Sequence, residues 1–180
     1  MKKRVIALMG RAGSGKSTLG KMVAKELGFK YLSTGDLART LSDLDWQEKG
    51  QFAPEDQIRA MVQKEIRKAT EPVVILDGMP RMADQVYFLI DLYDIDFICV
   101  ALDEDKARRR LMARGRVDDT DRAIEERLAT FKRNAPAIMS VIEGASISGL
   151  VGPLRVVQSE GDLRRSYDNF KKAVLEQLGE

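Results

Sequence analysis

The stretch that decides the fold is Gly10-Arg11-Ala12-Gly13-Ser14-Gly15-Lys16-Ser17, which fits the pattern G-x-x-x-x-G-K-[ST]. It follows a predicted strand, Arg4 to Met9, and opens a stretch of helical period, so it stands in the strand-loop-helix setting that this pattern requires. Glycines let such a loop curl until its backbone N–H groups point at phosphate oxygens, and the helix N-terminus adds partial positive charge. The pattern predicts a phosphate-binding loop in which Lys16 reaches the β- and γ-phosphates of a nucleoside triphosphate and Ser17 ligates Mg²⁺.

Outward from this loop, short β-rich runs alternate with longer segments of helical period, which is typical of a parallel sheet covered by helices on both faces. We expect strands at residues 4–9, 30–32, 73–76, 96–101 and 155–157. We expect helices at residues 16–27, 57–69 and 162–178, and another that starts near Asp121 and that Pro136 interrupts or kinks. The run Val73 to Leu76 is apolar throughout, so it should be an interior strand. The chain is therefore expected to form one α/β domain, a three-layer P-loop NTPase fold with a five-stranded parallel sheet.

The composition excludes several classes of protein. The 180 residues carry 30 Lys plus Arg against 28 Asp plus Glu, with no His and one Cys. These counts exclude catalysis by imidazole, metal sites with imidazole ligands and an intrachain disulfide. The near-neutral charge argues against a dedicated nucleic-acid binder, and no apolar run is long enough to span a membrane. We expect a cytoplasmic monomer.

Two further features of the sequence are typical of sites that transfer phosphoryl groups. Asp77 follows the buried strand, where its carboxylate can hold Mg²⁺ directly or through water. Arginine is dense between residues 108 and 127, and Arg114, Arg116 and Arg127 flank Gly115 and the acidic pair Asp118-Asp119. Guanidinium groups folded over a phosphoryl group in transfer stabilise its negative charge. We expect the acidic pair to hold these arginines in place.

Several ordered segments resemble the adenylate kinases of the nucleoside monophosphate kinase family, over essentially the whole chain. The matching segments are the phosphate loop, Leu32-Ser33-Thr34-Gly35-Asp36-Leu37-Ala38-Arg39, residues 48–54, Leu76-Asp77-Gly78-Met79-Pro80-Arg81 with Gln85, and Gly115-Arg116-Val117-Asp118-Asp119 leading into Glu126-Arg127-Leu128 and Pro136. The resemblance implies Mg²⁺-dependent, reversible transfer of a phosphoryl group from ATP to AMP, giving two ADP. It also implies a small helical domain at residues 34–69 that closes over AMP and a short lid at residues 114–119 over ATP.

The resemblance further implies a role for each matching residue. Thr34, Arg39 and Arg81 would hold the monophosphate of AMP beside Gly78, and Gln85 would hydrogen-bond the adenine edge, since an amide offers a donor and an acceptor together. Arg110 would stack on the adenine of ATP. Lys16, Asp77, Arg81, Arg116 and Arg127 would form the catalytic set, and Ser17 and Asp77 would hold the metal. The residues expected around ATP are Gly10, Ala12, Gly13, Ser14, Gly15, Lys16, Ser17, Thr18, Arg110 and Arg114.

Two departures from the family keep alternatives open. Most adenylate kinases have Gly where Ser17 stands, and a single residue, Gly115, separates Arg114 from Arg116 where relatives have several more. A shorter lid excludes less water, so we expect some ATP hydrolysis without AMP. The alternatives are the same chemistry on UMP, CMP or a small metabolite, or a non-catalytic nucleotide sensor.

Overall fold

The computed structural model describes residues 2–41, 53–116 and 119–180. Its elements follow in the order β1 (Arg4–Met9), α1 (Lys16–Leu27), β2 (Lys30–Ser33), α2 (Thr34–Ala38), α4 (Glu55–Lys68), β3 (Val73–Asp77), α5 (Ala83–Leu92), β4 (Asp94–Ala101), α6 (Glu104–Arg114), α7 (Asp121–Ile147), β5 (Arg155–Gln158) and α8 (Leu163–Leu178). Most of the family-like segment at residues 48–54, and Asp118 of the acidic pair, lie outside the described residues.

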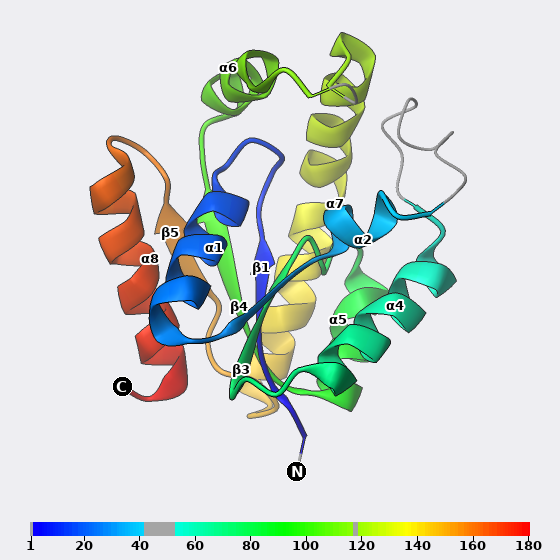
Figure 1. Cartoon of the computed structure of the whole chain (residues 1–180), viewed down its shortest axis with the longest axis vertical. Helices are drawn as coiled ribbons and strands as arrows, with labels where there is room; N and C mark the ends of the chain where they lie inside the picture. Colours follow the sequence, from blue (N-terminus) through cyan, green and yellow to red (C-terminus); the bar gives the residue numbers. More distant parts are fainter. Residues whose placement is uncertain (1, 42–52, 117–118) are drawn as a thin grey trace.

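The five strands form one parallel sheet in the order β2-β3-β1-β4-β5 (Figure 1). The first strand lies at its centre, where Ala7 pairs with Leu76 of β3 and with Phe97 of β4. Strand β3 is buried along its whole length between β2 and β1, as its unbroken apolar run predicts. The predicted P-loop NTPase fold is confirmed.

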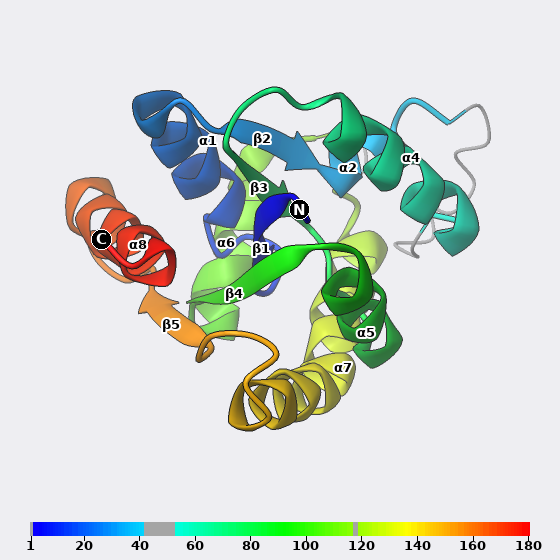
Figure 2. The same cartoon turned by 90° about the horizontal axis from the view of Figure 1, so that it is seen from below.

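Successive side chains of β1 point to opposite faces of the sheet, so the core has two layers. Val5, Ala7 and Met9 pack with residues of α5 and α7 on one face of the sheet. Ile6 and Leu8 pack with residues of α1 and α8 on the other face. Figure 2 looks along the sheet from below and shows α1 and α8 on one side and α5 and α7 on the other. Because both faces of the sheet are covered, the strands are nearly free of polar side chains except at their ends.

Helix boundaries differ from the sequence prediction at two places. Helix α4 begins at Glu55, directly after Pro54, rather than at Gln57. Helix α7 runs unbroken from Asp121 to Ile147 with Pro136 inside it, so the expected interruption is wrong, whereas the alternative expectation of a kink stays a prediction. A proline removes one backbone hydrogen bond of a helix. Buried side chains on both sides of it, Leu128 before it and Ile138 after it, keep both halves of the helix packed and offset that loss.

The carboxyl ends of the strands lie at the upper edge of the sheet in Figure 1, and helix α6 and the start of α7 stand over this edge. A small separate core of Leu102, Ala107, Leu111, Ile124 and Leu128 holds these two helices together. In open parallel sheets, ligands bind at this edge. None of the helices within the described ranges is both long enough and apolar enough to cross a bilayer.

Candidate active site

The phosphate loop passes tightly beneath helix α6. Gly10, Gly13 and Gly15 have φ angles of 142°, 81° and 94°, in the region that favours glycine. At Gly13 a Cβ atom would lie 2.5 Å from the backbone oxygen of Ala107 in α6, so the close approach itself requires glycine. The loop then enters α1 at Lys16, and no side chain within the described ranges caps this helix start. The first backbone N–H groups of α1 are thus left for an anion.

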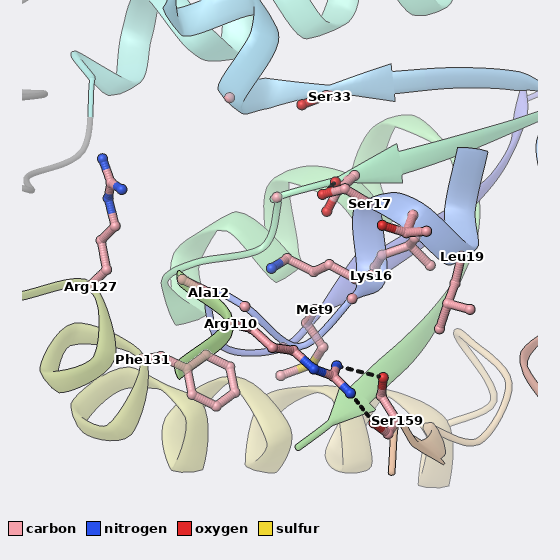
Figure 3. A pocket seen from close by; sticks show the side chains of 18 of the residues that line it. Met9, Ala12, Lys16, Ser17, Leu19, Ser33, Arg110, Arg127, Phe131 and Ser159 are labelled. Atoms are coloured by element: carbon pink, nitrogen blue, oxygen red, sulfur yellow. Dashed lines mark hydrogen bonds between the residues drawn. The ribbon is translucent and has the colours of Figure 1, made fainter. Parts of the chain in front are cut away.

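A cavity of about 590 Å³ opens over this loop, at the carboxyl edge of the sheet. Figure 3 shows the Lys16 side chain reaching into it, with Arg110 on one side and Arg127 of α7 on the other. The predicted site residues that line it are Gly10, Ala12, Gly13, Gly15, Lys16, Ser17, Thr18, Arg39, Asp77, Gly78, Arg81, Arg110, Arg114, Arg116 and Arg127. Ser14, Thr34 and Gln85 do not line it. Ser14 lies fully buried in the phosphate loop, and Thr34 and Gln85 line a second, smaller cavity.

The large cavity concentrates positive charge. Burial lowers the pKa of Lys16; the carboxylate of Asp77 opposes this shift, and the neighbouring Arg81 and Arg114 add to it. Burial also lowers the pKa of Arg81, which Asp77 again opposes and the charges of Arg127 and Arg39 reinforce. Cations that destabilise one another in this way are stabilised when an anion binds between them. The cavity is therefore suited to a group with several negative charges, such as a polyphosphate.

Asp77 sits at the end of β3 with its carboxylate directed into this charge cluster. Its side chain is buried, and its Oδ2 accepts hydrogen bonds from Ser17 Oγ at 2.5 Å and from the Tyr31 hydroxyl at 2.6 Å. Burial and then the negative charge of Asp77 raise the pKa of Tyr31, so its phenol stays a neutral donor. The other oxygen, Oδ1, is buried without a hydrogen-bond partner among the described residues.

This arrangement fits Mg²⁺. A hydroxyl and a carboxylate with one unpartnered oxygen are hard oxygen donors, which this ion prefers. No cluster of three or more Asp, Glu, Cys or His side chains suited to a metal occurs in the described part of the chain. Mg²⁺ is commonly held by one or two protein oxygens together with water and substrate phosphates, so Ser17 and Asp77 are sufficient as its protein ligands.

Asp119 organises the arginines at the mouth of the cavity. Its side chain is only 2% exposed, and it accepts hydrogen bonds from Arg114 Nε at 2.7 Å, from Arg114 Nη2 at 2.6 Å and from Arg127 Nη1 at 2.8 Å. Burial alone would raise the pKa of Asp119, but the hydrogen bond and charge of Arg114 and the charge of Arg127 outweigh it, so the net shift is downward. One carboxylate thus brings two guanidinium groups from different helices to one place.

Arg110 crosses from α6 to the loop after β5. Its Nη1 and Nη2 atoms donate to Ser159 Oγ at 3.3 Å and Ser159 O at 3.1 Å (Figure 3). The same guanidinium lies close to Gly15 of the phosphate loop. Stacking of Arg110 on a base remains a prediction. The side chain already bridges the phosphate loop and the wall formed by Ser159, Gly161 and Leu163.

The second cavity has a volume of about 40 Å³ and lies between α2, α4 and the start of α5. Ala38, Gly78 and Arg81 line both cavities, so the two meet at these residues. Arg81 Nε donates to Gly78 O at 2.6 Å and Nη2 to Thr34 Oγ1 at 3.4 Å. Gly78 has a φ of 93°, and a Cβ there would collide with Thr34 Oγ1. Glycine at this position thus permits the contact between the end of β3 and α2.

Sequence reasoning missed several residues of the site. Phe131, Asn134 and Ile138 line the large cavity together with Arg127. Their spacing of four, seven and eleven residues from Arg127 places all of them on one face of α7, which is a signal the sequence does contain. Asn134 Nδ2 also donates to Arg81 O at 3.0 Å. Tyr31 was missed because nothing in its local sequence indicates that its hydroxyl reaches Asp77.

Comparisons with known proteins identify a family and relatives of this chain. Residues 9–125 match the family model described as AAA domain. A protein named adenylate kinase from Prochlorococcus marinus is 28% identical over 181 residues, which cover 91% of this chain and 92% of the relative. Proteins of the same name from Bifidobacterium longum and Thermus thermophilus are 29% and 28% identical; the matches cover 88% and 80% of this chain, and 92% and 86% of the relatives.

Proposed function

This chain belongs to the AAA-domain family and is similar to adenylate kinases over most of its length, and from that membership we propose that it transfers the γ-phosphoryl group of ATP to AMP. The reaction would be reversible, would depend on Mg²⁺ and would give two ADP. Phosphoryl transfer between nucleotides needs one site for the donor phosphates and one for the acceptor, joined where the group moves.

The observation that carries the proposal is the junction of the two cavities at Gly78 and Arg81. On one side are the phosphate loop, Lys16 and the arginines held by Asp119. On the other side are Thr34 and Gln85, in a small cavity that both polar and apolar side chains line. Arg81 lies on both walls, so its guanidinium would contact the acceptor phosphate and the group in transfer. A site for a triphosphate alone would need no second cavity at this point.

The proposed chemistry relies on positioning and charge. Donor and acceptor are both anions, and their repulsion must be neutralised while the acceptor oxygen and the γ-phosphorus are held in line. Lys16, Arg116 and Arg127 supply this charge on the donor side, and Arg39 and Arg81 on the acceptor side. When bound, Mg²⁺ would neutralise negative charge on the β- and γ-phosphates. The acceptor phosphate oxygen is already ionised, so the absence of His from the chain is no obstacle.

Closure is part of the proposal. Residues 34–69, of which α2 and α4 are described, would form the small domain that closes over AMP. Residues 114–119 would form the lid over ATP, with Asp119 holding Arg114 and Arg127 ready for contact. Such closure excludes water from the phosphoryl group.

A coupled assay with ATP and a panel of acceptors tests the proposal. We expect AMP to be the best acceptor, with ADP as the product of the forward reaction and with ATP and AMP as the products when the assay starts from ADP. UMP, CMP and small hydroxylated metabolites are the alternative acceptors, and a preference for any of them would replace AMP in the proposal. Lys16→Met should abolish transfer, and unchanged transfer in this variant would remove Lys16 from the reaction. Wild-type protein that binds ATP but transfers its phosphoryl group to no acceptor would leave nucleotide sensing as the function.

A further inference from the structure

Gln85 is held between two internal partners of opposite hydrogen-bonding character. Its side chain is 5% exposed at the first turn of α5. Its Oε1 accepts a hydrogen bond from the backbone N–H of Arg81 at 2.6 Å, and its Nε2 donates to Glu55 Oε1 at 3.3 Å. Glu55 comes from the first turn of α4, so the contact joins two helices across the small cavity.

These two partners fix which way the amide points. A backbone N–H can only donate, and a carboxylate can only accept. If the Gln85 amide were turned over, its carbonyl would face the Glu55 carboxylate and its NH₂ group would face the N–H of Arg81. Both hydrogen bonds would be lost in a buried place. Two acceptors would then face each other at Glu55, and two donors would face each other at Arg81. The amide therefore has one stable orientation.

Glu55 is itself fixed in place as a carboxylate. Arg59, one turn further along α4, donates from Nε to Glu55 Oε1 at 2.6 Å and also pairs through Nη2. The same guanidinium pairs with Asp84 at 2.5 Å and lies 4.7 Å from the centre of the Phe88 ring, both on α5. Arg59 thus anchors Glu55 to the helix that carries Gln85.

The fixed amide has capacity left for a ligand. A glutamine amide has two donor hydrogens and two acceptor lone pairs, of which Glu55 and Arg81 use one each. One N–H on Nε2 and one lone pair on Oε1 remain. This pair matches a base edge that has a ring nitrogen acceptor beside an exocyclic amino donor, as in adenine and cytosine. Guanine, hypoxanthine and uracil present the reverse order, a ring N–H beside an oxo group.

We infer that Glu55 is a positioning residue that sets the base selectivity of the acceptor site, by holding the Gln85 amide in the orientation that accepts amino bases and rejects oxo bases. The inference rests on the proposed function, because it assigns the small cavity to the base of the acceptor nucleotide. It extends that function by naming what makes Gln85 selective. Without a carboxylate at position 55, only the N–H of Arg81 still favours this orientation. Turning the amide over then costs one hydrogen bond instead of two, so oxo bases are read more readily.

The test compares AMP with IMP, which differ at the six position of the purine and are alike in size. Glu55→Gln is the informative variant, because glutamine keeps the shape of the side chain but can both donate and accept. Asp84→Asn is the matched control, since it removes a charge from the same Arg59 network without touching Gln85. For each protein, kcat/KM is measured with AMP and with IMP at saturating ATP. The thermal shift that each mononucleotide induces is measured as a readout independent of turnover.

We expect wild type and Asp84→Asn to share one strong preference for AMP over IMP. In Glu55→Gln this preference should fall by about tenfold or more, with IMP use rising, since that factor corresponds to about one buried hydrogen bond. If wild type uses AMP and Glu55→Gln keeps the same AMP:IMP ratio in both readouts, the role of Glu55 is wrong while the proposed function stands. If wild type phosphorylates neither nucleotide, nor any other in the panel, the proposed function falls and this inference falls with it.

Discussion

Replacing Asp119 by asparagine tests whether the arginines at the cavity mouth must be held in advance. The substitution keeps the size of the side chain and one acceptor oxygen but removes the negative charge between Arg114 and Arg127. In wild type the Asp119 carboxylate accepts three hydrogen bonds of 2.6–2.8 Å, and its side chain is 2% exposed. The variant leaves two guanidinium groups that repel each other where one carboxylate had joined them.

The expected magnitude follows from these contacts. Hydrogen bonds to charged groups contribute about 1.5–3 kcal/mol each in buried settings. Arg114 and Arg127 are 33% and 20% exposed, so water screens part of the interaction. We expect the free energy of unfolding to fall by about 1–3 kcal/mol in total. We expect kcat to fall by about 10- to 100-fold, because an arginine that must be repositioned in each turnover loses about 1.4–2.7 kcal/mol of transition-state stabilisation.

The pH dependence of the unfolding free energy tests whether the Asp119 carboxylate is the group that stabilises the fold here. The folded-state pKa of Asp119 lies below its unfolded value, so its contribution to stability is complete above the unfolded pKa of about 3.9 and is lost as the pH falls through the lower, folded value. The difference in unfolding free energy between wild type and Asp119→Asn should therefore be constant between about pH 5.5 and 8 and shrink only below about pH 4.

The assays are steady-state kinetics with ATP and AMP and denaturant unfolding across this pH range. Asp121→Asn is the matched control, because it removes a carboxylate from an exposed position two residues along the chain. Wild-type kcat in Asp119→Asn, together with a large loss of kcat in Arg127→Ala, would show that Arg127 acts without being held and would refute this reasoning.

Three further predictions follow from the geometry. The short segment between Arg114 and Arg116 should permit ATP hydrolysis in the absence of AMP, and a phosphate-release rate equal to the no-enzyme background would contradict it. Gly78→Ala places a Cβ against Thr34 Oγ1 at a φ of 93°, so KM for AMP should rise at least about tenfold while KM for ATP changes little; equal changes would argue against a separate acceptor side. Burial raises the pKa of Cys99 to about 11, so a thiol reagent at pH 8 should modify it only after unfolding; rapid labelling of native protein would be the contrary result.

The sequence predicts those parts of the structure that depend on local pattern. The phosphate loop and the five strands lie where their residues indicate, because apolar runs, helical period and glycine act over a few neighbouring positions. Pro136 shows the limit of such reasoning. Its local effect is to break a helix, yet packing along α7 on both sides of it overrides that effect.

The same limit applies to the site. Many of the residues that line the large cavity could be named from motifs, but their partners could not. Tyr31 reaches Asp77 and Glu55 reaches Gln85 across gaps of 46 and 30 residues, and neither contact has a signature in the chain. Asp119 could be predicted as a partner of the arginines because it lies near them in sequence. Contacts between distant elements depend on how the helices pack, and this information resides in the fold.

The most direct test of the central claim is the mass balance of the reaction. Purified protein is incubated with Mg²⁺, ATP and AMP, and all nucleotides are quantified over time. The account predicts that one ATP and one AMP disappear for every two ADP formed, and that starting from ADP alone gives ATP and AMP in equal amounts. Protein that binds ATP but leaves AMP and every other mononucleotide unchanged would contradict it.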